Sequence, residues 1–263
     1  MRNKGFEASA TYTVWRNESG FLNAYAKIAT NDNRIRKISD ELRSYNESIK
    51  KTAEENGSTA PVAIYQDGTP VNAIWAVKSL GIDPNTGKEV FLDLEGNKTY
   101  TWSSAHLVNC GSSDPKYNGN FGFNGEYRGI GLSAVFTFHG GGKLYNNTLI
   151  DRVENCYIGQ NVDRRVFAER WYYSGQEAQY INGYKNGGTQ STSRFVQKNN
   201  VLSISSLNAY YEMPKRFVSR IGLQRLRFDV YMNDVATFSS IKVERGTSYP
   251  FARTLSFSLT GTF

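Results

Sequence analysis

The sequence predicts an all-β protein whose long antiparallel strands form part of a transmembrane β-barrel. Three observations support this. Apolar and polar residues alternate strictly in several long segments, short turns and long polar connections follow one another in regular succession, and glycine and aromatic residues are abundant. Alternation with a period of two places successive side chains on opposite faces of a sheet. In a membrane barrel one face meets lipid and the other meets a wet lumen, so each strand accommodates both kinds of residue.

Composition excludes several other classes. Hydrophobic residues make up only 39% and the mean hydropathy is −0.52, and no run approaches the roughly 18 apolar residues of a membrane helix. Aromatic residues at 14% are too abundant for a disordered chain. The net charge of +7 does not predict a nucleic-acid partner, because basic residues are mixed with acids along the chain and no zinc-finger or RNP-type motif accompanies them.

Seven segments of the chain alternate as strands do. In the fifth, the apolar phase slips between Ile204 and Leu207, which predicts a β-bulge near Ser205-Ser206. The seven predicted strands span residues 6–14, 22–28, 120–127, 130–139, 201–211, 225–233 and 254–263.

The connections between these strands alternate between short and long. Short periplasmic turns and long extracellular loops are typical of outer-membrane barrels, whereas a soluble sandwich is trimmed similarly at both ends. If the last strand ends in the periplasm, seven strands place the first residue outside the cell, and complete single-chain barrels have an even number. The pattern therefore predicts the C-terminal part of a larger barrel. The short turns are expected at 15–21, 128–129 and 212–224, and the long loops at 30–118, 140–200 and 234–253.

The first long loop has predicted structure of its own. Apolar residues recur at helical spacing from Arg34 to Ile49, and Gly57 ends the helix that they predict. A small hairpin is expected around 88–102, turned at Glu95-Gly96-Asn97.

The alternation assigns two faces to the last strands. In a membrane barrel, the polar set would line the lumen and the apolar set would meet lipid. A soluble carbohydrate-binding β-sandwich would instead cover the apolar set with a second sheet, and a small complete pore or adhesin would need an eighth strand. The predicted lumen-facing residues are Arg225, Arg227, Asp229 and Asn233, and the predicted lipid-facing residues are Leu226, Phe228, Val230, Leu255, Phe257 and Leu259.

The long loops carry many large aromatic side chains. These could stack on sugar rings or pack against a partner protein, or they could form a small loop core or part of the interfacial aromatic girdle. The candidates for substrate or partner contact are Trp75, Trp102, Trp171, Tyr172, Tyr173, Tyr180 and Tyr184.

No motif predicts an enzyme or a cofactor. The run from His139 to Gly142 matches the oxyanion-hole sequence of lipases, but the chain has no G-x-S-x-G elbow to present a nucleophile. The two histidines lack the partners of a zinc site. Oxygen ligands at Asp83 and Asp93 could bind Ca²⁺, although a turn is the simpler interpretation. For Cys110 and Cys156, one disulfide and two free thiols are both possible.

Several motifs resemble a known family. The alternating strand that ends at Phe263 resembles the C-terminal assembly signal of Gram-negative outer-membrane proteins. Five further patches, in family order along the whole chain, resemble the SusC/RagA group of TonB-dependent transporters of the Bacteroidota. They are NKGFE at 3–7, LGIDPNTG with FLD and EGN at 80–97, YRGIGL with GGGKLYN at 127–146, YEMP at 211–214, and YPFARTLSF at 249–257.

The resemblance implies that residues 1–263 are the C-terminal part of a plugged, 22-stranded barrel in the outer membrane. It implies import of a glycan or peptide nutrient together with a SusD-like surface lipoprotein, insertion by the barrel-assembly machinery, and contact with TonB through a preceding part. The plug, the TonB-contacting segment and a signal peptide are not expected within this sequence. The sequence departs from the family at Asn233-Asp234, where "NL" is usual, and the stretch 157–200 matches no family segment.

Overall fold

The computed structural model describes residues 1–157, 159, 161–183, 188–241 and 253–263. The chain divides into two compact units, and each is described by itself. The sheet unit comprises Gly5–Asn31, Pro115–Gly141 and Asn199–Phe263. The loop unit comprises Met1–Lys4, Asp32–Asp114 and Gly142–Lys198.

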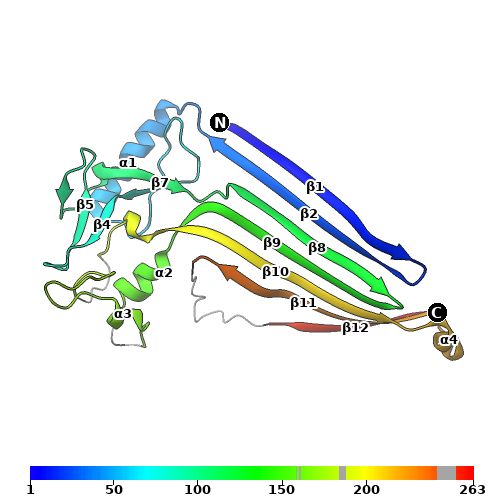
Figure 1. Cartoon of the computed structure of the whole chain (residues 1–263). Coiled ribbons are helices and arrows are strands. Elements are labelled where there is room, and N and C mark those ends of the chain that lie inside the picture. Colours follow the sequence, from blue (N-terminus) through cyan, green and yellow to red (C-terminus); the bar gives the residue numbers. More distant parts are fainter. Residues whose placement is uncertain (158, 160, 184–187, 242–252) are drawn as a thin grey trace. The chain divides into compact units, whose positions relative to one another are not determined.

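The seven long strands form one sheet, in which each is hydrogen-bonded to the next long strand along the chain (Figure 1). The pairs whose register is defined are antiparallel. The predicted all-β fold and its seven strands are therefore confirmed. In sheet order the strands are β1 (Arg2–Asn17), β2 (Gly20–Arg34), β8 (Tyr117–Tyr127), β9 (Ile130–Tyr145), β10 (Val196–Glu212), β11 (Arg225–Ser239) and β12 (Leu255–Thr262).

Several strands extend beyond the ends that alternation predicts. Strand β2 continues to Arg34, β9 continues to Tyr145, and β10 already begins at Val196. The added segments, such as Asn31–Arg34, carry polar residues on both faces, so they give no alternation signal. The long connections are accordingly shorter than predicted, at 35–116, 146–195 and 240–254.

A register shift near Ser205-Ser206 is confirmed, but the bulge predicted for the fifth strand lies on the strand paired with it. Ile204 pairs with Ala236 and Ser206 pairs with Asn233, so β11 advances one residue more than β10 between these pairs. The extra residue thus lies on β11, where Asp234 adopts a φ of 50°. Asp234 is the residue that departs from the family motif.

The loop unit contains one long helix and several short elements. A two-stranded sheet pairs β3 (Ala73–Val77) with β7 (Leu107–Ser112), and a three-stranded sheet contains β4 (Ser79–Ile82), β5 (Glu89–Leu92) and β6 (Lys98–Thr99). The hairpin predicted around 88–102 is confirmed in β5 and β6. The helices are α1 (Asp40–Asn56), η1 (Ser104–His106), α2 (Asn147–Leu149), η2 (Ile150–Glu154), α3 (Arg165–Ala168) and η3 (Ser193–Phe195).

The predicted loop helix forms as α1, but it begins at Asp40 rather than near Arg34. The hydroxyl of Ser39 accepts a hydrogen bond from the Leu42 amide and caps the helix there. Ile35 and Ile38 precede this cap, and both are buried in an irregular segment. These two residues are therefore apolar because they are buried before the helix begins, and their helical spacing does not mark its start. Gly57, with a φ of 73°, ends α1 as predicted.

Two small hydrophobic cores stabilise the loop unit. The first contains Ile150, Val153, Cys156, Val166, Tyr180 and Phe195. The second contains Ile64, Trp75, Val77, Phe91 and Leu107. Cys110 and Cys156 are both free thiols. Among the described residues, no helix is long and apolar enough to cross a membrane.

Candidate functional site

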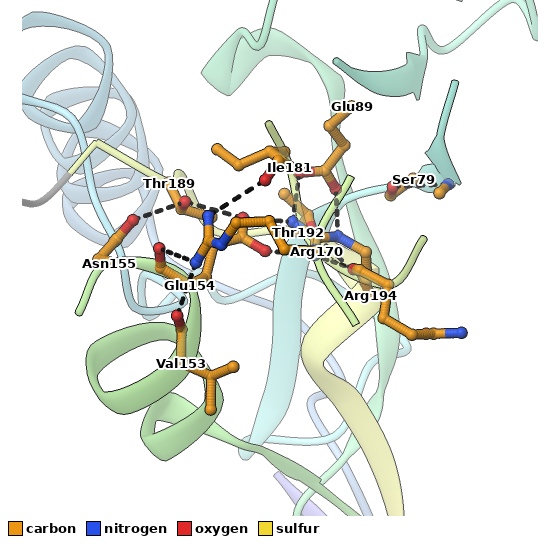
Figure 2. A network of polar contacts seen from close by, with 12 residues as sticks. Ser79, Glu89, Val153, Glu154, Asn155, Arg170, Ile181, Thr189, Thr192 and Arg194 are labelled. Carbon is orange, nitrogen blue, oxygen red and sulfur yellow. Dashed lines mark hydrogen bonds and ion pairs between the residues drawn. The ribbon is translucent and has the colours of Figure 1, made fainter. Parts of the chain in front are cut away.

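A buried ionic network lies within the loop unit (Figure 2). Arg194, in η3, forms an ion pair of 2.9 Å with Glu89 of β5 and one of 2.6 Å with Glu154 of η2. The side chain of Arg194 is 11% exposed and that of Glu154 is fully buried. Glu89 belongs to the connection 35–116 and Glu154 to the connection 146–195. The network therefore joins two long connections that are far apart in the sequence.

The geometry stabilises the buried charge of Arg194. Its two terminal nitrogens donate to the two carboxylate oxygens of Glu154, each at 2.6 Å, which is the bidentate arrangement that guanidinium groups favour. Burial lowers the pKa of Arg194, but the hydrogen bonds and charge of Glu154, and then those of Glu89, outweigh this effect and raise the pKa above its ordinary value. Thr189 also donates to Glu154, at 2.9 Å. The single positive charge of Arg194 thus offsets part of the negative charge of the two carboxylates, Glu89 and Glu154.

A second buried arginine organises the connection 146–195. Arg170 is fully buried, and its guanidinium donates to five backbone carbonyls (Figure 2). These carbonyls belong to Val153, Glu154, Val166, Ile181 and Gly183. Because a buried carbonyl needs a hydrogen-bond donor, Arg170 stabilises the backbone of several segments of this connection at one point.

A cavity of about 430 Å³ lies beside this network in the loop unit. Glu89 and Thr189 line it together with the aromatic rings of Phe91, Tyr100 and Trp102. The indole nitrogen of Trp102 donates to the Ser191 carbonyl at 3.0 Å, which fixes the ring. Amide and charged groups complete the lining, from Lys88, Asn182 and Gln190. Fixed aromatic rings with a few polar groups suit a polar organic ligand, and the volume lies in the usual range for such sites.

The aromatic residues that were predicted to contact a substrate or partner lie in different environments. Trp102 lines the cavity, whereas Trp75 and Tyr180 are 6% and 5% exposed and belong to the two cores. Burial, followed by the charge of Glu169, raises the pKa of Tyr180 to about 12. For Trp75 and Tyr180 the structure shows the alternative, a loop core.

The remaining loop aromatics lie closer to the surface. Trp171 donates from its indole nitrogen to the Pro84 carbonyl, and the Tyr172 hydroxyl donates to the Phe167 carbonyl. Tyr173 is 67% exposed. Tyr184 lies outside the described residues.

The residues predicted to face the lumen lie on one face of the sheet unit. Residues paired across neighbouring strands share a face, and Arg227 pairs with Thr260 while Asp229 pairs with Ser258. Arg227 forms a 2.6 Å ion pair with Asp229. These residues line a shallow groove of about 360 Å³ together with Asn208, Arg225, Tyr231, Ser258 and Thr260. Asn233 pairs with Ser206 beyond this groove.

The same face carries contacts that the sequence did not indicate. The Tyr210 hydroxyl donates to Glu126 at 2.6 Å, and the guanidinium of Arg227 lies 3.6 Å from the centroid of the Tyr210 ring. The Tyr210 ring lies over Gly131, where an added Cβ would be 2.0 Å from it. A glycine within a strand signals such a close approach, and Gly131 was the available clue.

The predicted lipid-facing residues lie on the opposite face. Phe228 pairs with Leu259, and Val230 pairs with Phe257. Phe257 is 73% exposed and Leu259 is 63% exposed. Within the described part of the sheet unit, no second layer covers this face. Leu226 and Leu255 continue the same stripe, and Phe263 is 87% exposed at the end of the chain.

The groups proposed for other chemistry have structural roles. Asp83 accepts hydrogen bonds from the Asn85 amide and the Thr86 hydroxyl, and Asp93 accepts from the amides of its own turn. The hydrogen bond from the Asn85 amide is the main cause that lowers the pKa of Asp83, and the bond from the Asn97 amide is the main cause that lowers the pKa of Asp93. The turn interpretation is confirmed. In the part of the chain that the structure describes, no group of three or more His, Cys, Asp or Glu residues could hold a metal ion.

The whole chain can be compared with known proteins. No family model matches it. TonB-dependent receptor P3 of Formosa agariphila (strain DSM 15362) is 22% identical over 91% of this chain and 24% of its own length. The solved RagAB peptide transporter matches with a TM-score of 0.72, at 19% identity, over 91% of this chain and 26% of that one. The RagAB peptide importer in its "open-open" state matches with a TM-score of 0.71, at 18% identity, over 91% of this chain and 25% of that one.

The chain therefore spans about a quarter of the length of these relatives. The similar proteins are named as receptors or transporters and not as enzymes. The fold match and the two-faced sheet agree with the motifs found in the sequence. The chain is similar to about a quarter of a TonB-dependent receptor, and it has the fold of the corresponding part of the RagAB transporter.

Proposed function

We propose that this chain forms wall and loops of an outer-membrane importer that takes up a glycan or peptide nutrient with energy relayed by TonB. The observation that carries the proposal is the separation of an exposed apolar face and a polar face on the same strands. A soluble sandwich would have to cover the apolar face, whereas lipid covers it without a further protein layer. The names of the similar proteins support uptake as the function.

The proposed orientation follows from the strands. The alternating apolar residues of β11 and β12, which include Leu226 and Leu259, face lipid. The polar groove around Arg227 faces the lumen or the plug. The short turns lie on the periplasmic side, and the long connections lie outside the cell. The strand ending at Phe263 is recognised by the barrel-assembly machinery. The energy of TonB reaches a plug that precedes this chain, so the chain itself needs no catalytic group.

The loop unit is the proposed region of substrate and partner contact. The cavity lined by Tyr100 and Trp102 provides aromatic surface beside Lys88 and Glu89, which suits a sugar ring or a peptide side chain. The exposed Tyr173 provides surface for a SusD-like lipoprotein. The buried pairs of Arg194 keep this surface rigid, which reduces the entropy cost of binding.

The face assignment is tested by one charge on each face of the last strand. In the full-length protein, Phe257→Lys should cost roughly 2–4 kcal/mol if the side chain lies near the membrane midplane. Ser256→Lys is the matched control, because the neighbouring residue projects to the opposite face, and it should cost far less. Stability is measured by denaturant unfolding from lipid vesicles. Equal costs at the two positions would overturn the assignment.

Substrate contact is tested separately. Tyr100→Ala should weaken binding of a peptide or oligosaccharide mixture to the purified full-length protein at least severalfold, whereas Tyr173→Ala should not. The two tyrosines are similarly exposed, at 56% and 67%, but only Tyr100 lines the cavity. Binding is measured without the lipoprotein partner. Unchanged binding in the Tyr100 variant would show that the cavity does not contact the substrate.

A further inference from the structure

The short-turn edge of the sheet unit is continuous. We use this name for the turns at 18–19, 128–129 and 213–224, with the residues beside them. The Arg128 amide donates to the Ser19 carbonyl at 2.9 Å, and the Glu212 amide donates to the Gly129 carbonyl at 2.7 Å. These bonds link each turn to the next. The third turn carries two short helices, α4 (Lys215–Val218) and η4 (Ser219–Ile221).

This edge is strongly basic. Five of its cationic residues are exposed, and in the described part of the chain none of these five forms an ion pair. Glu18 is the acid within the three turns, and the acids beside them, Glu126 and Glu212, bind Tyr210 and Arg225. Two arginines on the adjoining strand differ, because Arg225 pairs with Glu212 and Arg227 pairs with Asp229. The five unpaired cations are Arg16, Arg128, Lys215, Arg216 and Arg220.

Large apolar side chains accompany these cations. The guanidinium of Arg128 lies 5.2 Å from the centroid of the Tyr127 ring. The guanidinium of Arg216 lies 4.6 Å from the centroid of the Phe217 ring. Trp15 packs edge-on against Tyr127, with ring centroids 6.2 Å apart. Phe217 is 46% exposed. A guanidinium on an aromatic face keeps its N–H groups free at its rim for an anion.

Ile221 adds a further exposed apolar group to this edge. It is 63% exposed, although it sits in η4 next to Arg220. Val218, one turn earlier, is fully buried and anchors the segment. Exposed apolar groups beside free cations match the boundary of a bilayer, where rings and alkyl groups meet the acyl chains and long basic side chains reach the headgroups. Water or a nucleic acid would satisfy the cations but not Phe217 and Ile221.

We propose that the short-turn edge binds the headgroups of acidic phospholipids in the membrane leaflet on its side. The phosphate groups would pair with the five free cations, and the apolar groups would enter the acyl region just below. This inference rests on the proposed orientation of the sheet across the membrane, but it does not depend on transport or on any substrate. The proposal assigns part of the chain's net positive charge to this edge and names acidic headgroups as its partner.

The test uses the full-length protein in vesicles of equal parts phosphatidylethanolamine and phosphatidylglycerol. The protein is extracted with mild detergent, and the ratio of the two bound lipids is measured by mass spectrometry. The edge variant combines Lys215→Gln, Arg216→Gln and Arg220→Gln. The control variant combines Arg36→Gln, Lys37→Gln and Lys98→Gln, three exposed cations of the loop unit, so both variants lose the same charge.

Wild type and control should retain phosphatidylglycerol preferentially, and the edge variant should lose roughly fivefold or more of that preference. The estimate follows from about fivefold for each cation near an anionic surface, reduced by salt. Arg216→Lys with Arg220→Lys should keep the preference, because the charge is kept. In wild type alone, high salt should abolish it, which provides a test that needs no variant.

Equal phosphatidylglycerol retention in the edge and control variants would overturn the proposal, and so would the absence of any preference in wild type. Loss of an acidic periplasmic protein from the edge variant, with unchanged lipid ratios, would assign the surface to that protein instead. Failure of the Phe257 and Ser256 comparison would refute the orientation itself. The two experiments therefore fail in different ways.

Discussion

The sheet unit and the loop unit place the same residue types in opposite positions. In the loop unit Phe195 is 1% exposed and Val153 is fully buried, whereas in the sheet unit Phe257 is 73% exposed and Leu259 is 63% exposed. The loop unit is built like a small water-soluble domain, with its apolar side chains inside. The sheet unit is reversed on one face, and the proposed orientation places lipid against the apolar side chains there. With that orientation, the two units are suited to different surroundings.

Charged residues show the same contrast. The loop unit buries Arg194 with Glu89 and Glu154, so each group depends on the others for its charge to be tolerated. On the polar face of the sheet, the side chains of Arg227 and Asp229 are still 28% and 14% exposed. The comparison teaches that removing one charge should be costly in the loop unit and mild in the sheet unit.

The largest expected effect tests the first part of this comparison, the cost of removing a buried charge in the loop unit, against an exposed pair in the same unit. Arg194→Ala should destabilise the loop unit by roughly 3–5 kcal/mol, because it leaves two buried carboxylates without a cation. Hydrogen exchange of the loop-unit amides in the assembled protein measures this loss. The control is Arg43→Ala, which removes an exposed 3.6 Å pair with Asp40 and should change stability by less than about 0.5 kcal/mol. Similar protection in both variants would mean that the Arg194 pairs do not hold the connections together.

A phenylalanine comparison should give the next largest effect. Phe195→Ala leaves a cavity in the first loop core and should cost roughly 3 kcal/mol or more. Phe257→Ala should cost clearly less, because mobile acyl chains can fill the space beside the sheet. Both are measured by denaturant unfolding of the protein in vesicles. A larger cost at Phe257 would place that residue in a packed protein interior and contradict the contrast between the units.

The sequence predicted the sheet unit well because alternation is a local signal. Strands, short turns and the register shift near Ser205 follow from residues close together in the chain. The signal failed where polar residues occupy both faces, as at Asn31–Arg34, so strand ends were underestimated. The start of α1 was also misplaced, because Ile35 is buried for tertiary reasons and its spacing matches a helix by coincidence.

The site was less predictable. Glu89 and Arg194 are separated by more than a hundred residues, and no local pattern distinguishes a buried charge from an exposed one. The aromatic residues were the right type, yet sequence alone could not separate Trp75 in a core from Trp102 at a cavity. Both depend on which connections pack together, and this is decided by long-range contacts.

A smaller effect is expected on the polar face of the sheet. Tyr210→Phe removes the 2.6 Å hydrogen bond to Glu126 but keeps the ring over Gly131, and it should cost about 1–2 kcal/mol. In a Glu126→Gln background the same change should cost less, since the charged acceptor is already gone. Unfolding of the four proteins in vesicles completes the cycle. Strictly additive costs would show that Tyr210 and Glu126 do not interact in the membrane.

The smallest effect depends on pH and concerns the loop unit. Glu54 of α1 accepts a hydrogen bond from the Ser104 amide at 2.5 Å, and this bond is the main reason why its pKa is below the ordinary value of 4.5. A lowered folded pKa stabilises the folded state above the unfolded pKa, and this contribution is lost as the pH falls through the folded value. Glu54→Gln should therefore cost less than about 1 kcal/mol at neutral pH, because the group is exposed.

The difference between wild type and Glu54→Gln should shrink as the pH falls below about 4.5. Hydrogen exchange of the Ser104 amide, corrected for its intrinsic pH dependence, measures this difference. Glu55→Gln is a suitable control, since Glu55 makes only an exposed 3.8 Å pair with Lys51. A difference that grows on acidification would require a raised pKa for Glu54, and the carboxylate would then not cap η1. A pH dependence confined to the loop unit would show that the two units respond to acid independently.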